Sequence, residues 1–151
     1  MRKLFGTCLL VLLLGYAQAQ SNPVQWQYSA KKIDAGTWEV HLTATLQEGW
    51  HIYAQQQPAD AIATPTKFSF AKNPLIAVKG PVEEIGDVQK FKDPTLGIEQ
   101  LQYAKKVDFV QKVKLKGSVR TNITGSATFQ VCTNEKCLPP ATTNFSIALE
   151  G

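Results

Sequence analysis

The segment TWEVHLTATL, residues 37–46, alternates apolar and polar side chains along its whole length. Successive side chains of a β-strand point to opposite faces, so this alternation predicts a strand with one buried and one solvated face. The buried face would carry Trp38, Val40, Leu42, Ala44 and Leu46, and the solvated face Glu39, His41, Thr43 and Thr45. Helical periodicity is hard to find anywhere in the chain, so this segment decides the fold class: an all-β protein.

Similar short strands are predicted along the rest of the chain, with turn-forming residues such as Asn73-Pro74 and Gly117-Ser118 between them. They cover residues 24–30, 66–70, 74–80, 107–115, 127–131 and 143–149. In residues 107–115 the apolar phase is interrupted once, by Gln111. Roughly seven to nine short strands at this spacing predict an immunoglobulin-like antiparallel β-sandwich.

The first residues are typical of a signal peptide. Arg2 and Lys3 precede an apolar run over residues 4–16, and Ala17-Gln18-Ala19 offers small residues at the spacing of a cleavage site. The run is short for a bilayer-spanning helix, which needs about 20 residues. We therefore expect residues 1–19 to be removed and residues 20–151 to form one exported, soluble domain without direct membrane insertion.

The distribution of charge excludes a nucleic-acid-binding surface. The chain has 16 Lys and Arg residues against 12 Asp and Glu, and two of the basic residues lie in the predicted leader. The lysines are dispersed, and in residues 105–116 they alternate with apolar residues as on the solvated face of a strand. A nucleic-acid surface requires clustered basic residues interleaved with aromatic ones. We therefore expect no nucleic-acid partner.

The segment FQVCTNEKCLPP, residues 129–140, contains Cys132 and Cys137, the two cysteines that remain after removal of the leader with its Cys8. In an exported protein such a pair is able to form a disulfide. The pair could be a structural staple, two metal ligands or a working redox couple. Because Phe129 and Val131 belong to the apolar phase of the preceding strand, Cys132 is predicted to continue the polar phase and to face solvent.

Physical arguments favour the redox couple without removing the staple. Closing so short a loop stabilises a fold by about 2 kcal/mol, against more than about 4 kcal/mol for a loop of 100 residues. Thiol exchange needs an accessible sulfur and a nearby cysteine that resolves the mixed disulfide, and this loop provides both. A metal is disfavoured because the C-x₄-C spacing is wider than in zinc knuckles, and His41 and His51 are expected to be ordinary surface or packing residues. No cofactor or metal is predicted.

Residues 86–100, GDVQKFKDPTLGIEQ, show no clean alternation and are predicted to be a long connection. Long loops on rigid sandwiches often carry function, although a solvated crossover between sheets fits these residues equally well.

Several segments together resemble the N-terminal (alpha) domain of DsbD, the bacterial membrane thiol:disulfide interchange protein, in the version found in Bacteroidetes. They are GWHIYAQ (49–55), PTKFSF (65–70), KFKDPTLG (90–97), VDFVQKVKL (107–115) and VCTNEKCLPP (131–140), in the order of that family. The last of them, with its two cysteines followed by Leu-Pro-Pro, is the most specific.

The resemblance implies a periplasmic immunoglobulin-like domain that acts as a thiol:disulfide oxidoreductase through Cys132 and Cys137. Electrons would arrive from a membrane-embedded thiol reductase and leave to periplasmic thioredoxin-like or isomerase proteins, including those of cytochrome c biogenesis. By family position, Cys137 would form the mixed disulfide and Cys132 would resolve it. Asp93, Pro94, Thr95, Leu96 and Gly97 match the family's cap loop over the cysteines, and Tyr53 lies in a segment that contributes aromatic residues near them.

The chain departs from the family pattern at three points. Leu96 stands where the cap commonly presents an aromatic residue, and the cysteine loop is one residue shorter than in the best-known enterobacterial members. The sequence also contains no membrane or thioredoxin-like domain, so we expect the electron donor to be a separate protein. Asp93 is a candidate acid or base, although an Asp-Pro turn also forms for purely structural reasons.

The alternative from another functional class is an immunoglobulin-like module that binds a protein, with a purely structural disulfide. The accessibility and reducibility of the disulfide in the folded protein distinguish the two hypotheses.

Overall fold

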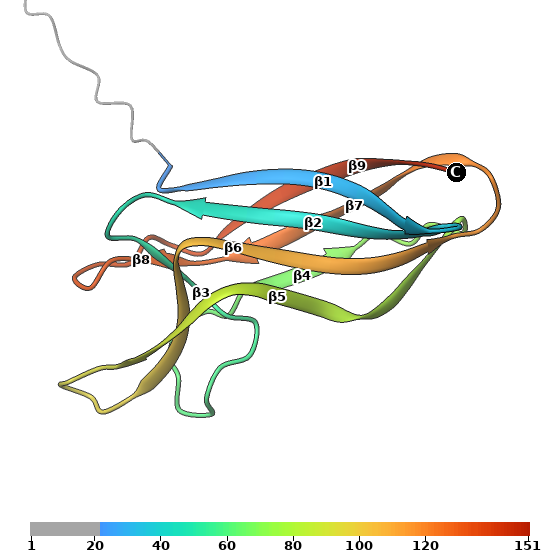
Figure 1. Cartoon of the computed structure of the whole chain (residues 1–151). Coiled ribbons are helices and arrows are strands. Elements are labelled where there is room, and N and C mark those ends of the chain that lie inside the picture. The colour runs from blue at the N-terminus through green and yellow to red at the C-terminus, as the bar shows by residue number, and fades with distance from the viewer. Residues whose placement is uncertain (1–21) are drawn as a thin grey trace, which may run out of the picture.

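The computed structural model describes residues 22–151, so the predicted signal peptide lies outside the described part of the chain. Nine strands make up its regular structure (Figure 1). They are β1 (Val24–Asp34), β2 (Thr37–Leu46), β3 (His51–Tyr53), β4 (Lys67–Phe70), β5 (Ile76–Lys92), β6 (Glu99–Leu115), β7 (Arg120–Phe129), β8 (Val131–Cys132) and β9 (Ala141–Glu150). Residues 22–151 contain no helix of the length and apolar character that a membrane crossing requires.

The strands form two antiparallel sheets that face each other (Figure 1). In the larger sheet the order is β1-β2-β6-β3-β8, and the long strand β6 pairs with β2 and then β3 along one edge and with β5 along the other. The smaller sheet has the order β4-β7-β9. The predicted all-β sandwich is therefore confirmed.

The core lies between the two sheets, where their alternating apolar faces meet. The predicted inner face of β2 is confirmed, because Val40, Leu42 and Ala44 are fully buried. Trp26 of β1 packs against Phe109 of β6, with ring centroids 6.0 Å apart. Burial of such side chains stabilises a fold by about 1.5–3 kcal/mol each, which makes this layer the main source of stability.

Gln111, the interruption in the apolar phase of β6, is buried and has a structural role. Its side chain is only 2% exposed, and Nε2 donates hydrogen bonds to the carbonyl oxygens of Lys79 (2.9 Å) and Gly80 (3.2 Å). The pairing of β5 with β6 changes register between Lys79 and Glu83. The glutamine thus satisfies carbonyl groups that the irregular strand leaves without ladder partners.

The prediction of a long irregular connection over residues 86–100 is wrong. β5 continues to Lys92 and β6 begins at Glu99, so only a short turn separates two paired strands. Figure 1 shows the two strands bending away from the sandwich and ending in a hairpin tip. The bend coincides with a register shift between Gly86 and Val88 and with the positive φ of Lys105. Alternation is obscured here because most side chains of the β5 half of this β5–β6 arm are exposed on both faces, and the buried residues of the β6 half include the polar Gln100 and Gln102.

Candidate functional site

The chain changes sheets just before the first cysteine. β7 ends at Phe129 in the smaller sheet, and after the single residue Gln130 the chain enters β8, which pairs with β3 in the larger sheet. Val131 and Cys132 are consequently both buried. The predicted solvent-facing position of Cys132 is therefore wrong, because the alternation of β7 does not continue through the crossing at Gln130.

The cysteine loop is a small hairpin closed by a disulfide. The Thr133 N–H donates to the Lys136 carbonyl (2.7 Å), and the Leu138 N–H donates to the Val131 carbonyl (3.0 Å). Cys132 and Cys137 lie directly opposite each other in this hairpin, with their Cα atoms 4.0 Å apart, and their sulfurs are bonded. The hairpin geometry brings the two sulfurs together without any contribution from a distant part of the chain.

The two sulfurs differ in their accessibility. Cys132 is 0% exposed, whereas Cys137 is exposed at the molecular surface. Thiol–disulfide exchange proceeds by attack of a thiolate on a sulfur that it can approach. Cys137 is therefore the cysteine that an external thiol can approach, whereas Cys132 is closed to solvent.

A cavity of about 390 Å³ opens beside Cys137, and four parts of the chain form its walls. They include His51 and Tyr53 of β3, Ile62 and Ala63 between β3 and β4, and Phe91, Asp93 and Gln100 of the β5–β6 arm and its turn. The cysteine loop itself supplies the remaining wall. The structure thus brings the predicted residues Tyr53, Asp93 and Cys137 to one cavity, although they are far apart in the sequence.

β3 is held rigidly at this cavity although it has only three residues. It pairs with β6 on one side and with β8 on the other, and His51 is the register partner of Cys132. The Thr66 hydroxyl donates to the Tyr53 carbonyl (2.6 Å), which fixes the exit of the strand. His51 Nε2 lies 3.3 Å from the Tyr53 hydroxyl oxygen. Burial lowers the pKa of His51 and raises that of Tyr53, so both side chains favour their neutral forms.

Gln130 connects the cysteine loop to the segment between β3 and β4. Its Nε2 donates to the Leu138 carbonyl (3.1 Å), and its Oε1 accepts from the Thr64 N–H (3.3 Å). Because Leu138 directly follows Cys137, this side chain positions the exit of the cysteine loop.

The turn at the tip of the β5–β6 arm contains the predicted cap residues. The Asp93 Oδ1 accepts hydrogen bonds from the N–H groups of Thr95 and Leu96, both at 2.8 Å. Gly97 closes the turn with a φ of 69°, a conformation that favours glycine. Asp93 lines the cavity, whereas Pro94, Thr95, Leu96 and Gly97 are exposed and do not. Leu96 is 61% exposed, and the aromatic side chain that the arm contributes to the cavity wall is that of Phe91.

Sequence reasoning missed several residues of this site, among them His51, Phe91, Gln100 and Gln130. His51 was expected to be an ordinary surface or packing residue, and only the pairing of β3 with β8 reveals its place beside the cysteines. Phe91 and Gln100 pair across the β5–β6 arm, in the segment predicted to be irregular. Of these residues, only Gln130 could have been singled out from the sequence, because it directly precedes Val131 and Cys132.

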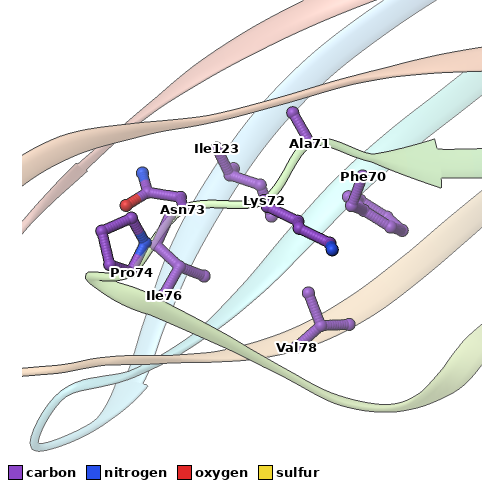
Figure 2. Close-up of a pocket in the computed structure, with 8 residues that line it drawn as sticks. All are labelled: Phe70, Ala71, Lys72, Asn73, Pro74, Ile76, Val78 and Ile123. Carbon is purple, nitrogen blue, oxygen red and sulfur yellow. The ribbon is translucent and has the colours of Figure 1, made fainter.

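A second and more open hollow, of about 450 Å³, lies at the other edge of the sandwich between the end of β4 and the start of β5. Figure 2 shows Phe70, Ile76 and Val78 on its walls, with Lys72 as its one ionisable side chain. It contains none of the predicted site residues. Although it is the larger of the two, it offers no group that could perform thiol chemistry.

Within residues 22–151, no three His, Cys, Asp or Glu side chains gather in an arrangement that could hold a metal ion. The functional groups of the candidate site are therefore the two sulfurs and the polar side chains around them.

The family model described as "Thiol:disulfide interchange protein DsbD, N-terminal" matches residues 18–149, nearly the whole chain. This protein belongs to that family. The resemblance seen in the sequence segments is confirmed. No curated protein matches the chain.

Several solved structures share the fold of this chain. The reduced DsbD N-terminal domain of Neisseria meningitidis aligns with a TM-score of 0.55 and 18% identity, over 83% of this chain and 86% of that one. The N-terminal periplasmic domain of ScsB from Proteus mirabilis aligns with a TM-score of 0.57 and 20% identity, over 87% of this chain and 48% of that chain. This chain thus spans about half the length of the ScsB domain.

A third structure is the complex between the DsbD N-terminal and PilB N-terminal domains of Neisseria meningitidis. It aligns with a TM-score of 0.50 and 14% identity, over 90% of this chain and 88% of that one. At these identities the comparisons establish the fold, and the predicted immunoglobulin-like sandwich is confirmed.

Proposed function

We propose that this protein is a periplasmic thiol:disulfide exchange module that passes reducing equivalents through Cys132 and Cys137. The observation that carries the proposal is the pairing of an exposed Cys137 with a fully buried Cys132 at the wall of a cavity. A purely structural disulfide does not require an exposed cysteine. Membership in the DsbD N-terminal family supports the same chemistry.

The exchange proceeds in two steps. In the reduced protein the Cys137 thiolate attacks one sulfur of a client disulfide, a bond forms between them, and the second client sulfur leaves as a thiolate. Cys132 then loses its proton and attacks the Cys137 sulfur, which forms the protein disulfide and releases the client as a dithiol. Two electrons pass to the client. The buried position of Cys132 supports its role as the resolving cysteine, because its sulfur is bonded to that of Cys137 and the residue is closed to solvent.

The proposed partners are proteins: one donates electrons to this disulfide, and others accept electrons from the reduced cysteines. A membrane-embedded thiol reductase would reduce the disulfide, and periplasmic thioredoxin-like or isomerase proteins, including those of cytochrome c biogenesis, would accept the electrons. The complex of the Neisseria domain with the N-terminal domain of PilB supports a protein as the partner of this chain.

We further propose that the turn Asp93–Gly97 acts as a cap that a protein partner displaces. The position of Asp93 and Phe91 on the wall of the cavity supports this role. In this protein Phe91 would provide the aromatic cover, since Leu96 does not line the cavity and is largely exposed.

The decisive experiment is the equilibrium reduction potential of the Cys132–Cys137 pair, measured by alkylation of the folded protein in graded thiol buffers. A value between about −120 and −270 mV, the range of exchange proteins, is expected. A disulfide that stays closed well below about −300 mV would contradict the proposal and favour a binding module with a structural disulfide.

The order of attack is tested with serine variants and oxidised glutathione. Reduced Cys132→Ser should accumulate a stable mixed disulfide between Cys137 and glutathione, because the resolving thiol is missing. Reduced Cys137→Ser should react far more slowly, since its remaining sulfur is buried. Mass spectrometry of the intact protein measures both products. A faster reaction of Cys137→Ser would reverse the assigned roles.

A further inference from the structure

His51 and Tyr53 form a buried polar pair next to the disulfide. They lie two residues apart on β3 and so share one face of the strand, which is a wall of the cavity beside Cys137. Their residual exposures are 7% and 4%. The contact between His51 Nε2 and the Tyr53 hydroxyl oxygen, at 3.3 Å, holds the imidazole ring in place. In the tautomer in which Nε2–H donates to that oxygen, Nδ1 is the ring nitrogen that can accept a proton.

Three other ionisable side chains line this cavity, and two of them already interact with other groups. Asp93, from the arm, already accepts two backbone N–H groups at Oδ1. Lys136, from the cysteine loop, has its Nζ 5.7 Å from the ring centroid of Trp50. Glu135 lies in the exposed part of the same loop. His51 is therefore the buried base of the cavity, and its strand pairs directly with that of Cys132.

We propose that His51 accepts the proton that the Cys137 thiol loses before attack, and that Tyr53 orients the imidazole for this transfer. The inference rests on the exchange function proposed above. The transfer takes place within the shared cavity, directly or through one water. His51 then returns the proton to the client sulfur that leaves as a thiolate. The proton taken from Cys137 thus ends on the client, and the imidazole is neutral again after the step.

The neutral imidazole is the form that this role requires. Because burial lowers the pKa of His51, the ring stays neutral to lower pH than a solvated histidine does. The base is thus available in mildly acidic conditions, where an unassisted thiol with an ordinary pKa of about 8.5 is almost fully protonated. The effect of His51 on the exchange rate should therefore be largest at low pH.

The test is the rate at which the reduced protein reacts with oxidised glutathione between about pH 5 and pH 9, a range that spans the titration of histidine and thiol. At about pH 6, His51→Gln should react at least roughly tenfold more slowly than the wild type, and the two rates should converge at high pH. Tyr53→Phe, which keeps the ring and removes the hydroxyl, should react at a rate between those of the wild type and His51→Gln.

The matched control is His41→Gln, which changes the only other histidine in the sequence. His41 is in β2 and contacts Asp108 at 2.7 Å, away from the cavity. The pH–rate profile of His41→Gln should match that of the wild type. Circular dichroism and thermal unfolding of each variant verify that it is folded.

Parallel pH profiles for the wild type, His51→Gln and Tyr53→Phe would overturn the role of His51 and leave the exchange function standing. A wild type that fails to react at any pH would overturn the exchange function, and the role of His51 with it.

Discussion

The local environments of individual side chains determine the chemistry of this site. Cys132 and Cys137 are joined by one bond, yet only Cys137 is open to solvent. In the proposed exchange reaction, this difference in exposure is what distinguishes the roles of the two sulfurs. The same holds for the two histidines, since His51 is enclosed beside the cysteines and His41 lies on the outer face of the larger sheet beside Asp108.

The burial of His51 predicts a pH dependence of stability. Its pKa in the folded protein is lowered from 6.5, so the unfolded chain binds a proton at a higher pH than the folded protein does. The contribution to stability is complete above about pH 6.5 and is lost as the pH falls toward the lowered pKa. The free energy of unfolding of the wild type should thus decrease more steeply below about pH 6.5 than that of His51→Gln. Urea unfolding at several pH values measures both, and equal slopes would contradict the prediction.

At the scale of the elements, short strands and crossings determine the position of the site. β3 has only three residues, but its pairing with both β6 and β8 places His51 and Tyr53 beside the cysteine loop. The crossing of the chain from β7 to β8 buries Cys132. The β5–β6 arm brings Phe91 and Asp93 to the same cavity.

The close approach of β4, β7 and β9 predicts a strong effect at Gly125. A Cβ atom at this position would clash with the Ser69 backbone carbonyl of β4 and would lie 2.6 Å from the Phe145 ring of β9. Gly125→Ala should therefore destabilise the fold by about 3 kcal/mol, since neither a strand backbone nor a packed ring moves easily. Denaturant unfolding measures the change. Ser126→Ala, at the next position of the strand, is the control and should cost less than about 0.5 kcal/mol; equal effects would contradict the assigned packing.

For the whole molecule, stability and chemistry reside in different places. The core between the two sheets consists mainly of apolar side chains from β1, β2, β6, β7 and β9, together with Ile52 of β3 and Val131 of β8. The disulfide closes a short hairpin at one end of these layers and links no distant parts of the chain. A redox module needs this separation, because it must keep its fold in both oxidation states.

Reduction of the disulfide is therefore expected to leave the fold intact. Opening so short a loop should lower the free energy of unfolding by about 2 kcal/mol or less. Urea unfolding of the oxidised and reduced proteins, with the far-ultraviolet circular dichroism of each, measures the loss. Unfolding upon reduction would show that the disulfide is essential to the fold and would count against a redox cycle.

The amino-acid sequence by itself determined the fold class and the chemical group of the site. Alternation along segments such as residues 37–46 reports which side chains are buried, because that pattern arises from each strand's own geometry. Spacing was also enough to single out Cys132 and Cys137, since they lie in one hairpin. Even the exception at Gln111 was visible in the sequence, although its carbonyl partners on β5 were not.

Only the tertiary structure decided which residues surround the sulfurs and which sulfur is exposed. His51, Phe91 and Gln130 reach the site through the pairing of β3 with β8, the β5–β6 arm and the crossing between sheets. These contacts join segments distant in the sequence, and a periodic pattern reports only the two faces of its own strand. The burial of Cys132 depends on such a crossing, where the alternation of one strand ends and that of the next begins.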